Sequence, residues 1–348
     1  MVDGLRGKMI NQNTLSRKKY LAKKIVIVDG LTGTGKTMIA PLLGKYERMQ
    51  NIRFLYTFEN VVLSATFEKI TSDAAATLLN LIADQALYDG LISRDSNFRP
   101  SDLSGVWPNG NLIKYMRQLF SKDGADVENK IRKEKPVLLL STHQLIFGID
   151  TLKMTFASRL KMIQMVRHPI YLFDHWVSYV SMHGNNPRDF TLWIKKNTRE
   201  LPWFAHGWEK QYLESSPEEK AVRSINALMD KVFDAKESGK YKKEILFVPF
   251  EAFVRKPLVY LKKIQNFLNQ KTTSKIYREL RRQKLPRQTI NEGPLKPIYE
   301  RYRAAEVRNL HKNNMTGKLQ KIGQKVSRSA FRDLLCTIQR YEKHFAEA

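Results

Sequence analysis

The segment Lys24–Leu43, KIVIVDGLTGTGKTMIAPLL, combines three features that together decide the fold. Its first part, Ile25–Asp29, is an apolar run typical of a strand buried on both faces of a sheet. Glycines then lead to Lys36 and Thr37 in the pattern G-x-x-x-x-G-K-[ST], and a helix start follows. Glycine lets the backbone wrap around an anion, and the helix N-terminus points free N–H groups at it. We therefore predict a phosphate-binding loop with contacts at Gly30, Thr32, Gly33, Thr34, Gly35, Lys36 and Thr37.

Short apolar runs alternate with longer amphipathic segments along the rest of the chain. The runs predict strands at Ile25–Asp29, Ile52–Phe58, Val137–Thr142, Lys161–Val166 and Glu244–Val248. Helical spacing predicts helices at Thr71–Gly90, Ile170–Met182, Pro217–Glu237 and Pro257–Asn269. Strands interleaved with helices favour an α/β fold of three layers, a parallel β-sheet with helices on both faces. We expect a basic N-terminal tail over 1–24, one domain over 25–297 and a helical extension over 298–348.

Composition limits the class of protein. Of the 348 residues 42% are hydrophobic and 27% charged, as in globular proteins. No stretch approaches the roughly 18 consecutive apolar residues of a membrane span, and the basic start lacks the core of a secretory signal. The single cysteine, Cys336, excludes an internal disulfide framework and a cysteine-built zinc site. These features predict a soluble, cytoplasmic protein.

The net charge of +26 is open to three interpretations. It fits a nucleic-acid binder, an enzyme with polyanionic ligands, or a compositional preference for lysine. The basic residues are spread along the chain, and no nucleic-acid recognition motif accompanies them. An anionic ligand or a compositional preference is therefore favoured.

The loop alone does not identify its nucleotide. An enzyme that uses a nucleoside triphosphate usually needs a carboxylate at the end of a second strand to hold magnesium. The strand at Pro136–Leu140 is followed instead by Ser141, Thr142 and His143. This departure argues against an ATP-dependent P-loop kinase, although that function stays open. A nucleotide-binding protein without catalysis also stays open.

Four segments in order resemble the sulfotransferase family, whose donor is 3′-phosphoadenosine-5′-phosphosulfate. IVIVDGLTGTGKTMIAPLL is similar to the family's 5′-phosphosulfate loop, and VLLLSTHQLIFG to its strand ending in K-T-H. KMIQMVRHPIYLFDHWVSY is similar to the segment V-R-x-P-x-D-x-x-x-S-Y, and ILFVPFEAFVRKPLVYLKKIQNFLN to Y-E-D-L-x-x-x-P…I-x-x-F-L. LPWFAHGWEKQYL also resembles bacterial members, so that the resemblance covers most of Lys24 to Asn269.

The resemblance implies the nucleotide-kinase-like sheet, the phosphosulfate donor and roles for particular residues. His143 would be the base that takes the acceptor's proton, and Lys36 would neutralise the leaving phosphate without a metal. Arg167 would hold the 3′-phosphate together with His175 or Ser178. The acceptor, a small molecule or a saccharide, anionic ones included, would present a hydroxyl or an amine.

The chain departs from the family's pattern at four places. The loop cation of the family is Gly33 here, and Lys36 replaces a threonine. The lysine of K-T-H is Ser141, and the usual phosphate-binding serine is His175, with Ser178 one turn later. We expect Glu251 to be structural. The basic residues Arg281, Arg282, Lys284 and Arg287 form either a solvated face or a lid over the 3′-phosphate.

Overall fold

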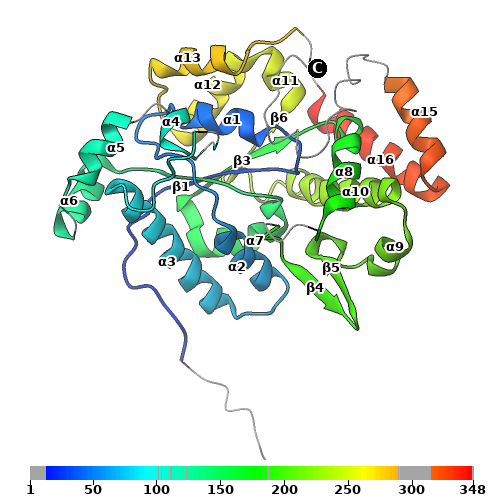
Figure 1. Ribbon diagram of the computed structural model, residues 1–348, viewed down its shortest axis with the longest axis horizontal. Coiled ribbons are helices and arrows are strands. Elements are labelled where there is room, and N and C mark those ends of the chain that lie inside the picture. The colour runs from blue at the N-terminus through cyan, green and yellow to red at the C-terminus, as the bar shows by residue number, and fades with distance from the viewer. Residues whose placement is uncertain are drawn as a thin grey trace, which may run out of the picture.

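A parallel sheet forms the centre of the computed structural model (Figure 1). The structure describes residues 13–346 except 101, 103, 110–111, 123, 186–188, 289 and 291–314. The strand order is β2–β1–β3–β6, and β1 pairs in parallel with both β2 and β3. Loops from neighbouring strands therefore meet at one edge, where open α/β sheets place their ligands. The strands are β1 (Ile25–Asp29), β2 (Leu138–Ser141), β3 (Leu160–Val166) and β6 (Ile245–Pro249).

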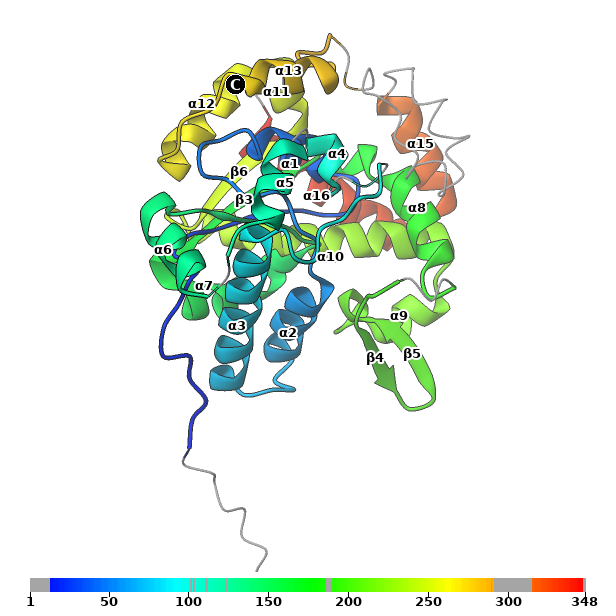
Figure 2. The same ribbon diagram turned by 60° about the vertical axis from the view of Figure 1, so that its left-hand side comes forward.

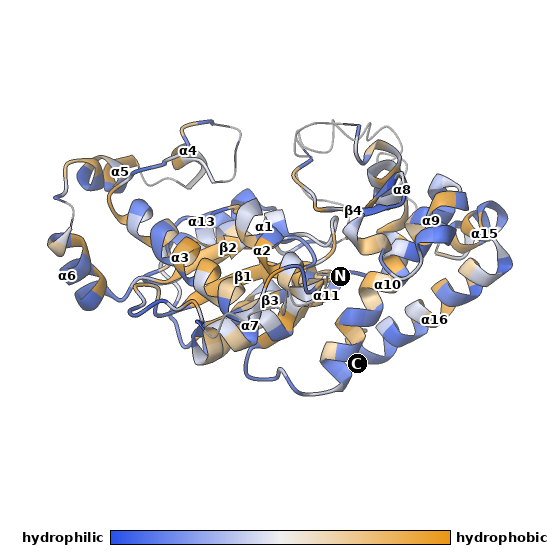
Figure 3. Cartoon of the chain, turned by 90° about the horizontal axis from the view of Figure 1, so that it is seen from below, coloured by the Kyte–Doolittle hydropathy of each residue, from blue (hydrophilic) through white to orange (hydrophobic). Residues whose placement is uncertain are grey.

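Helices cover both faces of this sheet, so the predicted three-layer α/β fold is confirmed. Side chains alternate along β1: Ile25 and Ile27 belong to one core, and Val26 and Val28 to the other. Figure 3 shows this apolar centre as orange strands between helices whose outer sides are blue. On the first face lie α2 (Tyr56–Thr66), α3 (Ser72–Leu91), α6 (Ala125–Glu134), α7 (Ile149–Phe156) and α10 (Pro217–Glu237). On the second lie α1 (Lys36–Leu43), α11 (Phe250–Arg255), α12 (Pro257–Leu268) and α13 (Lys275–Arg282).

The strand predicted at Ile52–Phe58 is wrong. Residues 49–53 do run beside β2, but they pair with it only through isolated bridges from Met49 to Val137 and from Arg53 to Leu140. Met49 and Arg53 are four residues apart, whereas their partners Val137 and Leu140 are three residues apart. The extra residue interrupts the strand pairing, as a β-bulge does. From Tyr56 onward the chain is helical, and the apolar residues assigned to a strand belong in part to α2.

A second group of elements lies beside the sheet edge that carries the loops (Figure 2). It consists of α8 (Phe173–Met182), the hairpin of β4 (Trp193–Lys196) and β5 (Arg199–Pro202), and α9 (Glu209–Glu214). Along the chain before β2 come α4 (Val106–Asn109) and α5 (Leu112–Leu119), which lie at another side of the molecule.

The C-terminal helices pack on the main body. In α15 (Met315–Lys325) and α16 (Arg328–Phe345), Ile322 and Leu334 share a core cluster with Phe173 of α8. The expected boundary at 297/298 lies outside the described residues, as do residues 1–12 of the expected tail. Residues 13–24 run along α3, where the backbone N–H groups of Leu21 and Ala22 donate to Asp84.

Among the described residues no helix combines the length and the apolar character that crossing a membrane requires.

Candidate functional site

One cavity gathers residues from distant parts of the chain at the carboxyl ends of β1 and β2. The phosphate loop forms one wall, the turn after β2 forms another, and α8 closes a third side. The sequence-predicted residues that line it are Thr32, Gly33, Gly35, Lys36, Thr37, His143 and His175. Gly30, Thr34, Arg167 and Ser178 do not line it.

The loop conformation requires glycine at three points. Gly30 has a φ of +147°, and a Cβ there would lie 2.5 Å from the backbone oxygen of Met165. Gly33 and Gly35 have φ of +92° and +91°, in the left-handed region that other residues rarely adopt. A Cβ at Gly35 would lie 2.5 Å from Cδ2 of Phe250, and one at Gly33 would lie 3.1 Å from Cδ2 of His175. Side chains at these positions would displace their neighbours, and Gly33 and Gly35 both line the cavity.

Contacts from other elements hold the loop in this shape. Nε2 of Gln144 donates to Oγ1 of Thr32 at 3.2 Å, and Nε1 of Trp176 donates to the Thr32 carbonyl at 3.0 Å. From the end of β3, Arg167 donates to the Gly33 carbonyl at 2.8 Å. Within the loop, the Thr34 hydroxyl donates to the Leu31 carbonyl at 2.7 Å. A site fixed before its ligand arrives loses less entropy on binding.

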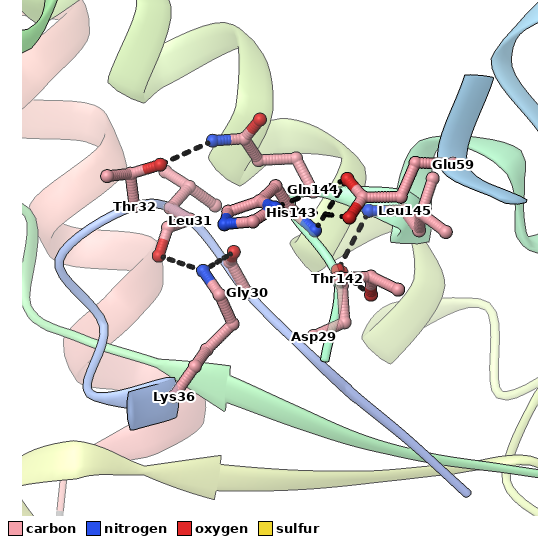
Figure 4. A network of polar contacts seen from close by, with 10 residues as sticks. All are labelled: Asp29, Gly30, Leu31, Thr32, Lys36, Glu59, Thr142, His143, Gln144 and Leu145. Atoms are coloured by element: carbon pink, nitrogen blue, oxygen red, sulfur yellow. Dashed lines mark hydrogen bonds and ion pairs between the residues drawn. The ribbon is translucent and has the colours of Figure 1, made fainter. Parts of the chain in front are cut away.

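Lys36 folds back over the loop (Figure 4). Its Nζ donates to the carbonyls of Gly30 at 2.6 Å and Leu31 at 3.0 Å. Burial lowers the pKa of Lys36 to about 8, while the negative charges of Asp29 and Glu59 oppose that shift. The ammonium group is thus mostly charged at neutral pH, and its two partners are neutral carbonyls, which an anion could replace.

A carboxylate orients His143. Nδ1 of the imidazole lies 3.2 and 3.3 Å from the two oxygens of Glu59, and the His143 backbone N–H donates to Glu59 at 3.1 Å. Tyr56 stacks on the ring at 6.0 Å between centroids. Because a carboxylate accepts hydrogen bonds, Nδ1 carries the proton and Nε2 is left as the acceptor. Figure 4 shows Nε2 facing the loop and Lys36.

Asp29 has a structural place. Its Oδ1 accepts hydrogen bonds from the Thr142 hydroxyl at 2.8 Å and from the Leu145 N–H at 2.9 Å. Its Oδ2 accepts from the Ile146 N–H at 3.1 Å, and the residue is fully buried. Asp29 therefore fastens the turn after β2 to β1. Within the part of the chain that the structure describes, no cluster of three or more His, Cys, Asp or Glu could hold a metal ion.

The three residues expected at the 3′-phosphate occupy different surroundings. His175 lines the cavity, and burial together with the charges of Arg167 and Lys36 lowers its pKa to about 4, so its imidazole is neutral at neutral pH. Arg167 lies behind the loop, with its guanidinium 4.5 Å from the centre of the Phe250 ring. The Ser178 hydroxyl donates to the Asp174 carbonyl in its own helix at 3.2 Å.

Other polar residues near this edge have internal partners. Glu251 accepts hydrogen bonds from the His168 backbone N–H at 3.1 Å and the Tyr341 hydroxyl at 2.6 Å, so its expected structural role is confirmed. In the basic group after α12, Arg287 is buried and donates to the Gln283 carbonyl at 3.1 Å. At least that member of the group is not a free cation of a lid.

Comparison with known proteins finds likeness in solved structures only. No family model matches the chain, and no curated protein matches it. The structure is similar to the sulfotransferase domain of the Synechococcus PCC 7002 olefin synthase, at 13% identity over 95% of this chain and 98% of that one, with a TM-score of 0.44. It is also similar to the sulfotransferase domain from the curacin biosynthetic pathway (11% identity, 91% and 97% covered, TM-score 0.44). A third similar structure is mouse sulfotransferase SULT7A1 complexed with PAP, at 13% identity over 95% of this chain and 91% of that one, with a TM-score of 0.37. Likeness at these scores decides neither family nor function.

Sequence reasoning missed Glu59, Tyr56 and Gln144. For Tyr56 and Glu59 the cause is the wrong strand at Ile52–Phe58, which hid the start of α2. A signal was present, because Phe58, Val62 and Leu63 recur at helical spacing with the acidic Glu59 on the same buried face. An acid on an apolar face needs a partner, and His143 is that partner.

Proposed function

We propose that this protein transfers a sulfuryl group from 3′-phosphoadenosine-5′-phosphosulfate to a hydroxyl or an amine of an acceptor. One observation carries the proposal: the Glu59–His143 pair faces Lys36 across a single cavity beside a phosphate loop. A base and a buried cation on opposite sides of the reacting atoms are what an in-line displacement needs. The choice of donor rests on the sequence resemblance.

His143 acts as the general base. Its Nε2 takes the proton of the acceptor's O–H or N–H while the acceptor atom bonds to sulfur. Glu59 is a positioning residue that fixes the ring and its tautomer, and it stabilises the imidazolium once the proton has moved. The sulfur–oxygen bond to the 5′-phosphate breaks at the same time, and the donor leaves as the 3′,5′-bisphosphate.

Lys36 neutralises the charge that develops on the leaving phosphate. To do so its Nζ exchanges the Gly30 and Leu31 carbonyls for the bridging oxygen. Backbone N–H groups of the loop and the Thr37 hydroxyl hold the 5′-phosphate oxygens. His175 donates to the donor as a neutral imidazole, and Arg167 and Ser178 turn from their present partners to the 3′-phosphate.

An ATP-dependent kinase is the second candidate, because the loop meets the G-x-x-x-x-G-K-[ST] pattern. The two strands beside β1 argue against it. β2 leads into Thr142 and His143, and β3 leads into Arg167, so neither supplies the carboxylate that usually holds magnesium.

Ligand-induced stabilisation separates these candidates. A ligand that binds only the folded protein raises its melting temperature by mass action. We expect 3′-phosphoadenosine-5′-phosphate to raise Tm without magnesium, and ATP to have little effect with or without it. If ATP with magnesium stabilises the protein and 3′-phosphoadenosine-5′-phosphate does not, the kinase becomes the favoured function.

Turnover distinguishes an enzyme from a nucleotide-binding protein without catalysis. His143→Ala should reduce transfer from the labelled donor by about 10²- to 10⁴-fold while leaving the nucleotide-induced Tm shift intact. His206→Ala, at an exposed imidazole, is the matched control. Equal turnover of the two variants would remove His143 from the mechanism.

Away from the loop the cavity is lined by the apolar or aromatic side chains of Tyr56, Leu63, Phe190 and Trp203 and by polar residues such as Asn60 and Asp189. We infer a small acceptor with an apolar body that also carries polar groups. We place the reaction in the cytoplasm on the sequence grounds given above.

A further inference from the structure

Helix α5 carries its apolar face outward. Surface helices normally turn apolar residues to the core. Here Gln118 is only 7% exposed and faces inward, where the hydroxyl of Ser93 lies 3.4 Å from its Oε1. The same hydroxyl donates to the carbonyl of Tyr115 at 3.0 Å. Polar contacts therefore hold α5 to the body of the protein.

The opposite side of α5, together with Phe120 just after its end, carries a stripe of large apolar side chains. They recur at spacings of one, three and four residues, which places them on one side of a helix. Phe120 and Ile113 are 81% and 71% exposed, more than any other large hydrophobic side chain among the described residues. We define the apolar stripe as Leu112, Ile113, Met116, Leu119 and Phe120.

A cationic hollow lies directly beside the apolar stripe. Lys114 and Arg117 of α5 line it together with Lys130 of α6 and Lys275 of α13. Glu134 is the one carboxylate in its lining as described. Four cations against one anion attract a negative group, and the net charge of +26 adds a long-range contribution.

We propose that the apolar stripe and the cationic hollow seat the protein on an anionic lipid surface. Ile113 and Phe120 enter the boundary between headgroups and acyl chains, and the cations bind lipid phosphates at headgroup level. A second copy of the chain is disfavoured, because it would bring two cationic hollows together. An acidic protein would satisfy the cations, but α5 lies at an outer side of the molecule (Figures 1 and 3) and its apolar side chains are exposed, which suits a fluid apolar phase.

Vesicle co-sedimentation of the full chain tests this contact without reference to catalysis. We expect binding to phosphatidylcholine vesicles that contain phosphatidylserine, much weaker binding to phosphatidylcholine alone, and release as salt screens the charges. Ile113→Ser/Phe120→Ser should weaken binding by about tenfold or more. Leu258→Ser, at a side chain 58% exposed on α12, is the apolar control and should bind like the wild type.

A charge pair of variants completes the test. Lys114→Gln/Arg117→Gln should abolish the preference for phosphatidylserine, whereas Arg328→Gln/Arg332→Gln, which removes two exposed cations of α16, should keep it. Equal losses in both pairs would show that only net charge matters and would overturn the proposal. So would unchanged binding after Ile113→Ser/Phe120→Ser. A chain that ignores all vesicles but self-associates through the apolar stripe, or binds only an acidic protein, overturns it as well.

Discussion

Glu59 is the residue on which the proposed chemistry most depends. It is 6% exposed and contacts His143 through both carboxylate oxygens. An imidazole on a flexible turn could rotate away from the acceptor. The carboxylate contacts Nδ1 and the Tyr56 ring lies parallel to the imidazole, which favours the orientation in which Nε2 is presented to the reacting atoms.

Replacing Glu59 by Gln should separate kcat from binding. The amide keeps the shape of the side chain but loses the charge that fixes the tautomer and stabilises the imidazolium. We expect kcat to fall by about 10²-fold, with KM for the donor changed little, and Glu59→Asp to recover part of the loss. Steady-state kinetics of these variants provide the measurement. Glu68→Gln, which removes the charge of an exposed carboxylate shortly after α2, is the matched control. A rise in KM without a fall in kcat would contradict a positioning role.

Gly33 and His175 are neighbours in the structure, and both differ from the residues of the family that the sequence resembles. The family that the sequence resembles has a cation at the position of Gly33 and a serine at that of His175. In this structure the imidazole lies where a side chain at position 33 would be, 3.1 Å from its Cβ. A larger side chain at position 33 and the imidazole of His175 in its present place would therefore compete for the same space.

At the scale of elements, the sequence predicted those parts whose pattern is local. The bounds of β1 and α10 match the prediction, since a buried parallel strand is continuously apolar and a long surface helix has a clear period. The strand prediction at Ile52–Phe58 was wrong, because the residues of a bulge and of a helix start can be as apolar as those of a strand. The β4–β5 hairpin was not predicted, because its strands are short and only partly buried.

The candidate site divides in the same way. The loop and His143 follow strands and could be placed from the sequence. Helical spacing marks Glu59 as an acid on a buried face, but its pairing with His143 could not be predicted, because their distance is set by how α2 packs on the sheet. The inward turn of Gln118 and the outward turn of Ile113 likewise depend on which face of α5 the body offers, and no periodicity gives that.

The C-terminal helix α16 should unfold together with the main body. Leu334 is 1% exposed in a cluster with Ile170 and Val222. Leu334→Ala should lower the free energy of unfolding by about 2–5 kcal/mol and keep a single transition in urea. Arg332→Ala, on the exposed side of the helix, should have little effect. A separate extension would instead give a second transition, with the first unchanged.

At the scale of the whole molecule, buried imidazoles link folding to pH. Burial is the main cause that lowers the pKa of His168, His175 and His183. Glu251 and Glu342 oppose the shift at His168, and Asp189 opposes it at His183, whereas Arg167 and Lys36 increase it at His175. Each imidazole thus takes up a proton more readily in the unfolded chain than in the folded one.

Stability should therefore fall as the pH drops below the ordinary histidine pKa of about 6.5. Between that value and the folded pKa of about 4 for His175, the unfolded chain binds the extra proton, so acid favours unfolding. At pH 5.5 His175 alone should cost about 1 kcal/mol relative to pH 7.5. Urea unfolding at the two pH values measures the loss, and His175→Gln should reduce it by that amount. His206→Gln, at an exposed imidazole, should keep the full pH dependence. If His175→Gln loses as much stability in acid as the wild type does, the surroundings of His175 do not lower its pKa in the folded protein, and the acid sensitivity has its source in other groups.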